Sequence, residues 1–412
     1  MTAWIIDACR TPRGIGKPGK GSLSTVHPQR LGASVLTALA ERNQLNTDDV
    51  DDVIFGTSLQ MGTQSGDLGR MAALDAGFST TASGVSLDRF CGSGITAVSL
   101  AAGMIGAGFE NLVIAGGVEM MSTYAANRAG SRKFAFLDTD NLHLRALHPF
   151  TQQGVAADAI ATIDGIPRDA LDELAAESQR RAAVAIAEGR FARSLIPVHD
   201  EDGSVLLDSD EYPRPSTTLE TLATLPPAFE AMADAPLDES GITYRAQVLR
   251  RYPGLEINHV HHAGNSSGVV DGAAAVLLAS EEYAKSHGLT PRARVVAAAN
   301  VGDDPTLMLN APGPAARKAL RQAGLTTADI DLFEVNEAFA VVAEKFIRDL
   351  DLDREKVNVN GGSIALGHPI GATGAMLIGT VLDELERRDG RFGLVTMCTA
   401  GGMAPAVIIE RL

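Results

Sequence analysis

The chain has 412 residues, more than a single hydrophobic core usually organises, so we expect two or more domains or a duplicated architecture. Hydrophobic residues make up 45% and charged residues 21%, a balance that is typical of compact globular proteins and excludes a disordered chain. The formal net charge of -16 at pH 7 argues against nucleic acids and anionic membranes as partners.

The three cysteines, Cys9, Cys91 and Cys398, are odd in number and far apart, which argues against a disulfide framework and fits a reducing compartment. The N-terminus, MTAWIIDACRTP, has no basic segment followed by an apolar one. The apolar runs elsewhere look too short, or too interrupted by glycine, to span a bilayer. We therefore expect a cytoplasmic protein without a membrane span.

Four segments of the N-terminal part recur in the same order near the C-terminus. In chain order they are AWIIDACRTP, a strand and turn; residues 31–57, a helix and strand; residues 84–102, a strand, glycine-rich turn and helix; and NLVIAGGVEMM, a strand ending in a Gly-Gly turn. Their counterparts are residues 293–305, 315–337 and 357–379 and the segment GLVTMCTAGGM. Four ordered matches indicate a duplication. The alternation of helices with short apolar strands predicts a mostly parallel sheet covered on both faces.

The helices that begin near Gly94 and Gly371 are rich in small residues, which lowers helix propensity but allows close backbone approach. We expect them to pack against each other as a shared layer between two sheets, with further helices outside. The predicted fold class is therefore α/β, a duplicated five-layer αβαβα fold with an inserted loop domain. The N-terminal half spans 1–121 and is completed by about 253–275, the insertion spans 122–252, and the C-terminal half spans 276–412.

Within the insertion the repeat disappears and the density of charged residues rises. An insertion beside a cleft is either a substrate-binding lid or an oligomer contact. Arg128, Arg132 and Lys133 form a basic cluster there, which is either a patch for an anionic ligand or a solvated loop.

Cys91 lies in LDRFCGSGITAV, at a predicted strand-to-helix turn. Unpaired backbone N–H groups and the helix dipole at such a turn favour an anion, so we expect a lowered thiol pKa and a thiolate nucleophile. The alternative is a small buried apolar residue. The flanking Gly92, Ser93 and Gly94, and the match to a second reactive turn, favour the nucleophile.

The second turn carries His368 in ALGHPIGATG, where Pro369 fixes the start of a helix. A neutral imidazole there could take the proton of Cys91. Cys398, in TMCTAGGM, ends the strand that follows this helix and is a candidate second acid or base. Asn336, in FEVNEAFA, also ends a strand and could orient a water or an oxyanion donor.

Three further histidines, His259, His261 and His262, suggest a metal site, but no carboxylate or cysteine completes a ligand set at suitable spacing in the sequence. We interpret them as residues that line a pocket or pack, and we predict no metal.

Six motifs in this order resemble those of the thiolase family. They are RFCGSGITAV, AGGVEMMS, AGNSSGVVDGAAA, NEAFA, GGSIALGHPIGATG and MCTAGGM, within a resemblance that runs from Cys9 to the final strand. The resemblance implies an acyl-CoA C-acyltransferase. Such an enzyme cleaves a 3-oxoacyl-CoA with CoA, or condenses two acyl-CoA molecules, with coenzyme A as substrate and no metal or redox cofactor.

By this resemblance, Cys91 accepts the acyl group, His368 activates it, and Cys398 moves the proton on the α-carbon. Asn336 holds a water that, with His368, stabilises the enolate oxygen. The backbone N–H groups of Cys91 and Ala400 form a second oxyanion site. The resemblance also assigns Ser267, Phe339 and Met308 to substrate and CoA binding.

Some positions depart from the family pattern. Ala400 stands where glycine is common in the family, but alanine keeps the backbone N–H group. Gln152 and Gln153 stand where acyl-chain contacts are common. Leu309 and Ala311 replace glycines. The acyl-chain preference therefore includes three alternatives, acetoacetyl-CoA and a longer or a branched 3-oxoacyl-CoA.

Two other functions remain as alternatives, a condensing enzyme of the ketoacyl synthase kind and a non-catalytic acyl-CoA-binding or scaffold subunit. The second cysteine, Cys398, argues against the first, and the complete set of reactive residues argues against the second. The resemblance further implies a homodimer or homotetramer, with a hydratase/dehydrogenase as a candidate partner subunit.

Overall fold

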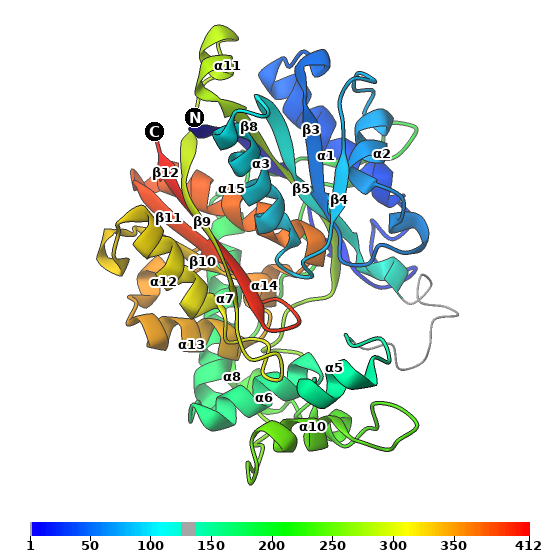
Figure 1. Cartoon of the computed structure of the whole chain (residues 1–412), viewed down its shortest axis with the longest axis vertical. Coiled ribbons are helices and arrows are strands. Elements are labelled where there is room, and N and C mark those ends of the chain that lie inside the picture. Colours follow the sequence, from blue (N-terminus) through cyan, green and yellow to red (C-terminus); the bar gives the residue numbers. More distant parts are fainter. Residues whose placement is uncertain (1, 125–136) are drawn as a thin grey trace.

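The computed structural model describes residues 2–124 and 137–412 (Figure 1). The basic cluster of Arg128, Arg132 and Lys133 lies outside the described residues. The strands are β1 (Ala3–Arg10), β2 (Gly14–Ile15), β3 (Asp52–Gly56), β4 (Val85–Leu87), β5 (Leu112–Met120), β6 (Val198–His199), β7 (Val205–Leu207), β8 (Val270–Ser280), β9 (Ala293–Gly302), β10 (Leu332–Val335), β11 (Phe392–Thr396) and β12 (Met403–Arg411).

The α-helices fall into those of the two halves and those of the insertion. The first group is α1 (Pro28–Asn43), α2 (Leu68–Asp75), α3 (Ser93–Ala107), α11 (Glu281–Ser286), α12 (Pro312–Ala323), α13 (Ala340–Leu350), α14 (Ser363–Leu366) and α15 (Ile370–Arg388). The second group is α5 (Leu142–Leu147), α6 (Gln153–Ile163), α7 (Arg168–Ala187), α8 (Leu219–Ala223), α9 (Glu230–Ala233) and α10 (Tyr244–Arg251). Short 3-10 helices lie at Thr47–Asp49, Gly62–Gln64, Met121–Thr123, Thr327–Asp329 and Arg354–Lys356.

The main sheet has 10 strands in the order β10-β11-β12-β9-β1-β8-β5-β3-β4, with β2 beside β8. Within the described residues, the strands of the two halves meet only where β1 pairs with β9, at Trp4 with Arg294 and Ile5 with Ala293. The two sheets expected from the duplication are therefore joined into one by this short pairing. β8, from the segment after the insertion, lies between β1 and β5 and continues to Ser280.

Helices cover this strand array in the predicted layers. α1 packs on β1, β5 and β8, α12 packs on β9, β11 and β12, and α3 and α15 contact each other and strands of both halves. Figure 1 shows α3 and α15 between the N-terminal strands and the C-terminal strands. The five-layer αβαβα arrangement is thus confirmed, and the two central helices form its middle layer.

Glycines permit the close contact between the central helices. A Cβ atom on Gly94 would lie 2.8 Å from the backbone nitrogen of Ala375, and one on Gly374 would collide with the backbone nitrogen of Ile95. Each helix therefore lacks side chains where the other backbone passes, which brings the first turns of α3 and α15 together.

We expect Gly374→Ala to lower the free energy of unfolding by about 1–3 kcal/mol, because the new methyl group pushes the backbone of α3 away from α15. The control is Gly379→Ala on the same helix, whose Cβ would have its nearest neighbour, the Cβ of Ala8, at an ordinary 3.4 Å. Urea unfolding of both variants at one protein concentration measures the difference. Equal stabilities would mean that the helix contact tolerates a side chain.

The expectation of a mostly parallel sheet was wrong. β3 is parallel to β4 and β5, and β10 to β11, whereas β8 is antiparallel to β1, β2 and β5, and β9 and β12 are antiparallel to their neighbours. Helical crossovers produce the parallel pairs, and the tight turn between β11 and β12 reverses the chain. The predicted Gly-Gly turn at Gly116 and Gly117 was also wrong, since both glycines lie inside β5.

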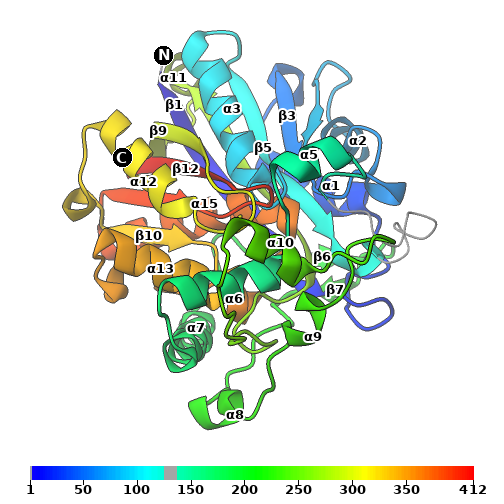
Figure 2. The same ribbon diagram turned by 60° about the horizontal axis from the view of Figure 1, so that its bottom comes forward.

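The helices of the insertion gather at one end of the molecule, and Figure 2 brings this end forward. The longest, α7, packs against α13 and α14 of the C-terminal half. Pro167 precedes its first residue, and Gly189 follows its end with φ +68°. The insertion is therefore mainly helical and is anchored to the C-terminal half by α7.

One helical stretch among the described residues, Phe90–Ala107, is long and apolar enough to cross a membrane by length and composition alone. It is the central helix α3 with the turn before it, and it packs against α15 and β5. Its apolar character is that of a core helix, because small residues replace charged ones where the two central helices touch.

Candidate active site

Cys91 lies in the turn that leads into α3 and is buried, with 6% of its surface exposed. Ser93 holds this turn, since its Oγ accepts from Arg89 N at 2.9 Å and donates to Phe90 O at 2.7 Å. Phe90 has a positive φ of 47°, a conformation that such a local network can maintain. A Cβ on Gly92 would lie 2.6 Å from the Thr399 side chain, so the turn sits directly against the segment after Cys398.

The expectation that Cys91 has a lowered pKa was wrong. Burial raises the pKa of the Cys91 thiol to about 12, and the carboxylate of Glu119 adds to this rise. A hydrogen bond from the backbone N–H of Cys91 lowers the pKa, but this effect is smaller than that of burial. Cys91 therefore rests as a neutral thiol at neutral pH, and its proton must be removed when it reacts.

His368 lies just before α15 and is held on its backbone and on one side of its ring. Its backbone N donates to Gly268 O at 2.8 Å, and its Nδ1 lies 2.6 Å from Thr373 Oγ1. The Thr373 hydroxyl lies 2.9 Å from Pro369 O and donates to it, so Nδ1–H is the donor to Thr373 and Nε2 keeps its lone pair. Burial, followed by the charge of Arg13, lowers the pKa of His368 to about 3. The ring is therefore a neutral base, as the sequence predicts.

Asn336 lies at the end of β10 and faces the free nitrogen of this ring. Its Nδ2 is 3.4 Å from His368 Nε2, and its Oδ1 accepts from Ser363 Oγ at 2.5 Å. Its backbone N donates to Thr396 O at 3.1 Å, which ties it to the end of β11. The hydroxyl of Ser363 thus orients the amide so that its NH2 group points to the imidazole.

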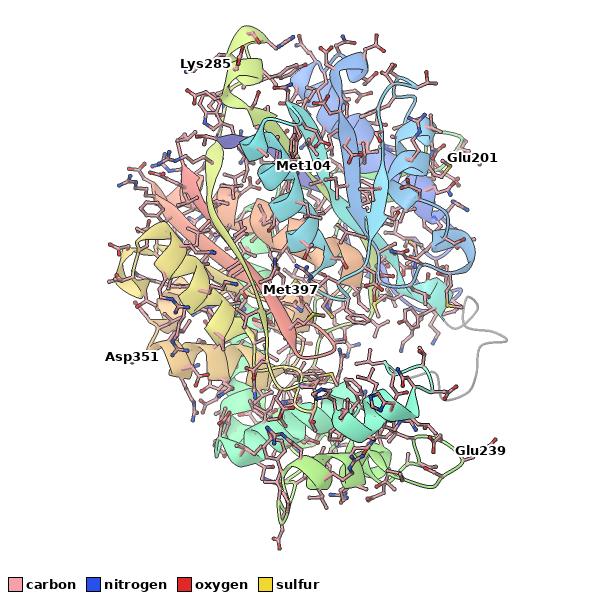
Figure 3. The ribbon with its side chains drawn as sticks, in the orientation of Figure 1. Met104, Glu201, Glu239, Lys285, Asp351 and Met397 are labelled. Carbon is pink, nitrogen blue, oxygen red and sulfur yellow. The ribbon has the colours of Figure 1, made fainter. Side chains whose placement is uncertain are left out.

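Cys398 and Ala400 lie in the turn between β11 and β12. Gly401 and Gly402 have φ of +80° and +76°, and Thr399 N donates to Met403 O at 2.8 Å. The preceding residue, Met397, lies in the interior of the molecule, where Figure 3 labels it. Burial raises the pKa of the Cys398 thiol, and its electrostatic interaction with Cys91 raises it further. The turns that carry the two cysteines adjoin, since a Cβ on Gly92 would lie 2.6 Å from the Thr399 side chain.

The residues expected to contact CoA divide into two groups. Ser267 N donates to Ala338 O at 3.0 Å, next to Phe339, and Gly268 N donates to Ser363 O at 3.1 Å, so the Ser267 loop is bonded to the Asn336 and His368 segments. Met308 instead packs in the apolar core that also contains Phe339, with φ +43°. Gln152 caps α6, because its Oε1 accepts from Gly154 N at 2.6 Å.

The three clustered histidines are paired with carboxylates. His259 Nδ1 and His261 Nδ1 lie 2.6 Å and 2.7 Å from the two oxygens of Asp158, and His262 Nε2 lies 2.9 Å from Asp172 Oδ1. Among residues 2–124 and 137–412, no group of three or more histidine, cysteine, aspartate or glutamate side chains is placed to hold a metal ion. These histidines follow the predicted insertion in the chain and pack against its helices α6 and α7, as the sequence suggests.

A pocket of about 430 Å³ lies against the residues that flank Cys91 and Ala400. Its lining includes Phe90, Phe150 and Pro305, together with Gly401, Gly402 and Met403. Phe90 precedes Cys91, and Gly401 follows Ala400. The pocket therefore adjoins the turn before α3 and the turn between β11 and β12.

Three polar residues of the site were missed in the sequence. Thr373 fixes the tautomer of His368, Ser363 orients Asn336, and Glu119 acts on Cys91. The available signal was strongest for Glu119, a lone acid within the otherwise apolar strand LVIAGGVEM. Thr373 and Ser363 both belong to the motif GGSIALGHPIGATG, but short polar residues in glycine-rich turns also serve turns alone.

Comparison with known proteins decides the family. The chain matches the family model of the thiolase N-terminal domain over residues 3–235 and that of the thiolase C-terminal domain over residues 289–411. The chain belongs to the thiolase family. As a thiolase it is an acyltransferase.

Full-length relatives carry several substrate names. This thiolase is 40% identical to the beta-ketoadipyl-CoA thiolase of Acinetobacter baylyi, over 100% of this chain and 99% of that protein. It is 40% identical to the acetyl-CoA acetyltransferase of Escherichia coli, over 99% of this chain and 98% of that protein. It is 39% identical to the steroid 3-ketoacyl-CoA thiolase of Mycobacterium tuberculosis, over 100% of this chain and 94% of that protein.

Proposed function

We propose that this thiolase cleaves a 3-oxoacyl-CoA with CoA, or condenses two acyl-CoA molecules in the reverse direction, through an acyl-enzyme on Cys91. The observation that carries this proposal is the contact of Asn336 Nδ2 with His368 Nε2, on a ring whose other nitrogen is fixed by Thr373. That arrangement leaves one basic nitrogen, beside an amide donor, in a site that also contains two neighbouring thiols.

In the first half of the proposed reaction, Cys91 Sγ attacks the 3-oxo carbon of the substrate while His368 Nε2 takes the thiol proton. The bond between C2 and C3 then breaks, the acyl group stays on Cys91, and the electron pair leaves as the enolate of acetyl-CoA. Cys398 gives a proton to C2 of this enolate. Asn336, through a water, and His368 stabilise the enolate oxygen, a contribution of roughly 10²- to 10³-fold in rate for one such donor.

In the second half, a CoA thiol attacks the acyl group on Cys91. The CoA proton goes to the Cys398 thiolate that the first half left, and the proton held on His368 goes to the departing Cys91 sulfur, so both cysteines return to neutral thiols. The backbone N–H groups of Cys91 and Ala400 hold the oxyanion of the tetrahedral intermediate. CoA is thus a substrate, the cycle balances without electron transfer, and the proposal includes no metal or redox cofactor.

The contacts of the Ser267 loop support a role in CoA binding. Its backbone joins the segments of Phe339, Ser363 and His368, so a pantetheine arm that lies along Ser267 and Phe339 would deliver its thioester to the catalytic turns. We also propose contact with Met308, although this residue is packed in the core, 1% exposed. The acyl group would lie in the pocket beside Phe90 and Met403.

Steady-state thiolysis of a series of 3-oxoacyl-CoA substrates tests the function. The series should run from acetoacetyl-CoA through longer and branched chains, and should include 3-oxoadipyl-CoA because a relative is named for that acyl group. We expect CoA-dependent formation of acetyl-CoA and a shortened acyl-CoA, detected by mass spectrometry. Binding of every substrate without turnover would instead indicate a scaffold subunit, and decarboxylation of malonyl-CoA a ketoacyl synthase.

We further propose a cytoplasmic homodimer or homotetramer, with a hydratase/dehydrogenase as a candidate partner. Apolar side chains are exposed on or beside the last turns of α3, at Leu100, Met104 and Phe109. Their exposure supports a contact with a second copy. Analytical ultracentrifugation decides between the two assemblies, and copurification with each candidate subunit tests the partner.

A further inference from the structure

We propose that Glu119 is a positioning residue for acyl transfer, because its carboxylate joins the first turn of α15, which follows His368, to the loop that follows β3. The proposal rests on the proposed function, since it assigns Glu119 to the reaction of Cys91 and His368. It concerns a residue that does not touch the reacting atoms and acts through the segments that carry them.

The strand β5 aims Glu119 at the central helices. Val113 and Ala115 of β5 belong to the core around α3 and α15, whereas Ile114, Val118 and Met120 belong to the outer core under α1. Because side chains alternate along a strand, Glu119 shares the inner face with Val113 and Ala115. Gly117 lies on that face too, and a Cβ there would collide with Gly371 O. The missing side chain lets α15 start close enough for Glu119 to reach it.

The carboxylate is buried, and its partners are all hydrogen-bond donors. Its Oε2 accepts from Ser58 N at 2.8 Å and Gly371 N at 2.9 Å, and its Oε1 accepts from Gln64 Nε2 at 3.1 Å, Leu59 N at 3.2 Å and Thr57 Oγ1 at 3.5 Å. Four of these partners are N–H groups, which cannot accept a hydrogen bond from a protonated carboxyl, so they favour the ionised form. Burial raises the pKa of Glu119, and the donors oppose that rise.

Two consequences follow for the reaction. First, Glu119 satisfies a free N–H group in the first turn of α15, so the segment of His368 is tied to the N-terminal half. Second, its negative charge adds to the effect of burial, which keeps Cys91 a neutral thiol at rest. Asp88 also raises the pKa of Cys91, and Cys91 in turn raises the pKa of Cys398. The charge of Arg13 lowers the pKa of His368.

The test compares Glu119→Gln, which removes the charge at nearly constant shape, with Asp271→Asn. Asp271 is a matched buried carboxylate on the neighbouring strand β8, paired in register with Met120 and bonded to Ser122 N at 2.7 Å. We expect Glu119→Gln to speed alkylation of Cys91 by iodoacetamide roughly tenfold at a given pH, through a lowered thiol pKa. We expect its kcat to fall by about 10- to 100-fold through displacement of His368. Asp271→Asn should leave the alkylation profile of Cys91 unchanged.

Peptide mass spectrometry measures alkylation at Cys91 separately from Cys9 and Cys398, so this readout does not depend on turnover. A Glu119→Gln variant that merely melts earlier, with wild-type kcat and a wild-type alkylation profile, would overturn the proposal. Turnover missing in the wild type, with the alkylation contrast present, would overturn the proposed function instead. If Glu119→Gln does not fold, Gln64→Met decides. It keeps the charge but removes one donor to the carboxylate, together with the acceptor of Met120 N. A several-fold lower kcat at an unchanged melting temperature supports positioning, and a wild-type kcat refutes it.

Discussion

Cys91→Ala lowers kcat/KM for thiolysis by about 10⁴-fold or more, because the reaction then has no group to accept the acyl chain. Incubation of the wild-type protein with an acyl-CoA adds one acyl mass to the peptide that contains Cys91, and the variant shows no such addition. No other single substitution in the site should cost as much activity, because every later step starts from the acyl-enzyme. Intact-protein and peptide mass spectrometry, together with the steady-state assay, give both readouts.

Cys9→Ser is the matched control for Cys91→Ala. Cys9 is also buried, burial raises its pKa, and its Sγ donates to Val35 O at 3.4 Å, so it is a structural cysteine of β1. The control should keep its acyl labelling and its turnover per folded molecule. Acyl mass on Cys9 or Cys398 of the Cys91→Ala variant, or turnover within tenfold of the wild type, would show that the nucleophile lies elsewhere.

Cys398→Ala is expected to keep acyl labelling of Cys91 while carbon–carbon bond formation falls by about 10²- to 10⁴-fold, the usual contribution of a general acid or base. The reason is that the two cysteines have separate roles, since Cys398 transfers the proton at the α-carbon and Cys91 carries the acyl group. Two half-reactions separate these roles. Exchange of the acyl group between acetyl-CoA and isotopically labelled CoA should survive in the variant, and exchange of the acetyl methyl protons with deuterated water should disappear.

Cys398→Ser is the conservative companion of that variant. A hydroxyl of higher intrinsic pKa should restore less proton exchange than the thiol supplies, yet it keeps the volume of the turn. If Cys398→Ala instead abolishes both labelling and acyl exchange while the fold is retained, the two cysteines act as one unit, and the division of labour is wrong.

Much of the layer arrangement could be predicted from the sequence because duplication repeats a pattern. The small residues near Gly94 and Gly374 predict helices in close contact, and the structure places the backbones of α3 and α15 against each other there. Strand direction could not be predicted in the same way. Alternating helices and strands favour parallel pairs, but β8 enters between β1 and β5 from a distant part of the chain and runs antiparallel to both.

The reactive residues could be found from their motifs, whereas their charge states depend on burial. A helix terminus lowers the pKa of an exposed thiol, yet Cys91 is enclosed and faces Glu119, so both effects act in the opposite direction. Gly116 and Gly117 resemble a turn in the sequence because glycine pairs usually mark one. Their function in the folded chain is to admit neighbouring backbone atoms, Ala274 O and Gly371 O, which only the assembled tertiary structure reveals.

The contact between His368 and Thr373 affects when in the reaction His368 can accept a proton. Many catalytic imidazoles donate a hydrogen bond to a carboxylate, whose negative charge offsets the positive charge of the imidazolium. The partner of His368 is a neutral threonine hydroxyl, and the charge of Arg13 disfavours a cation on the ring. An imidazolium at His368 consequently costs free energy unless negative charge develops beside it, as on the substrate in the proposed reaction. In the proposed reaction His368 therefore accepts the proton of Cys91 as the substrate carbonyl gains negative charge, so this proton transfer depends on a bound thioester.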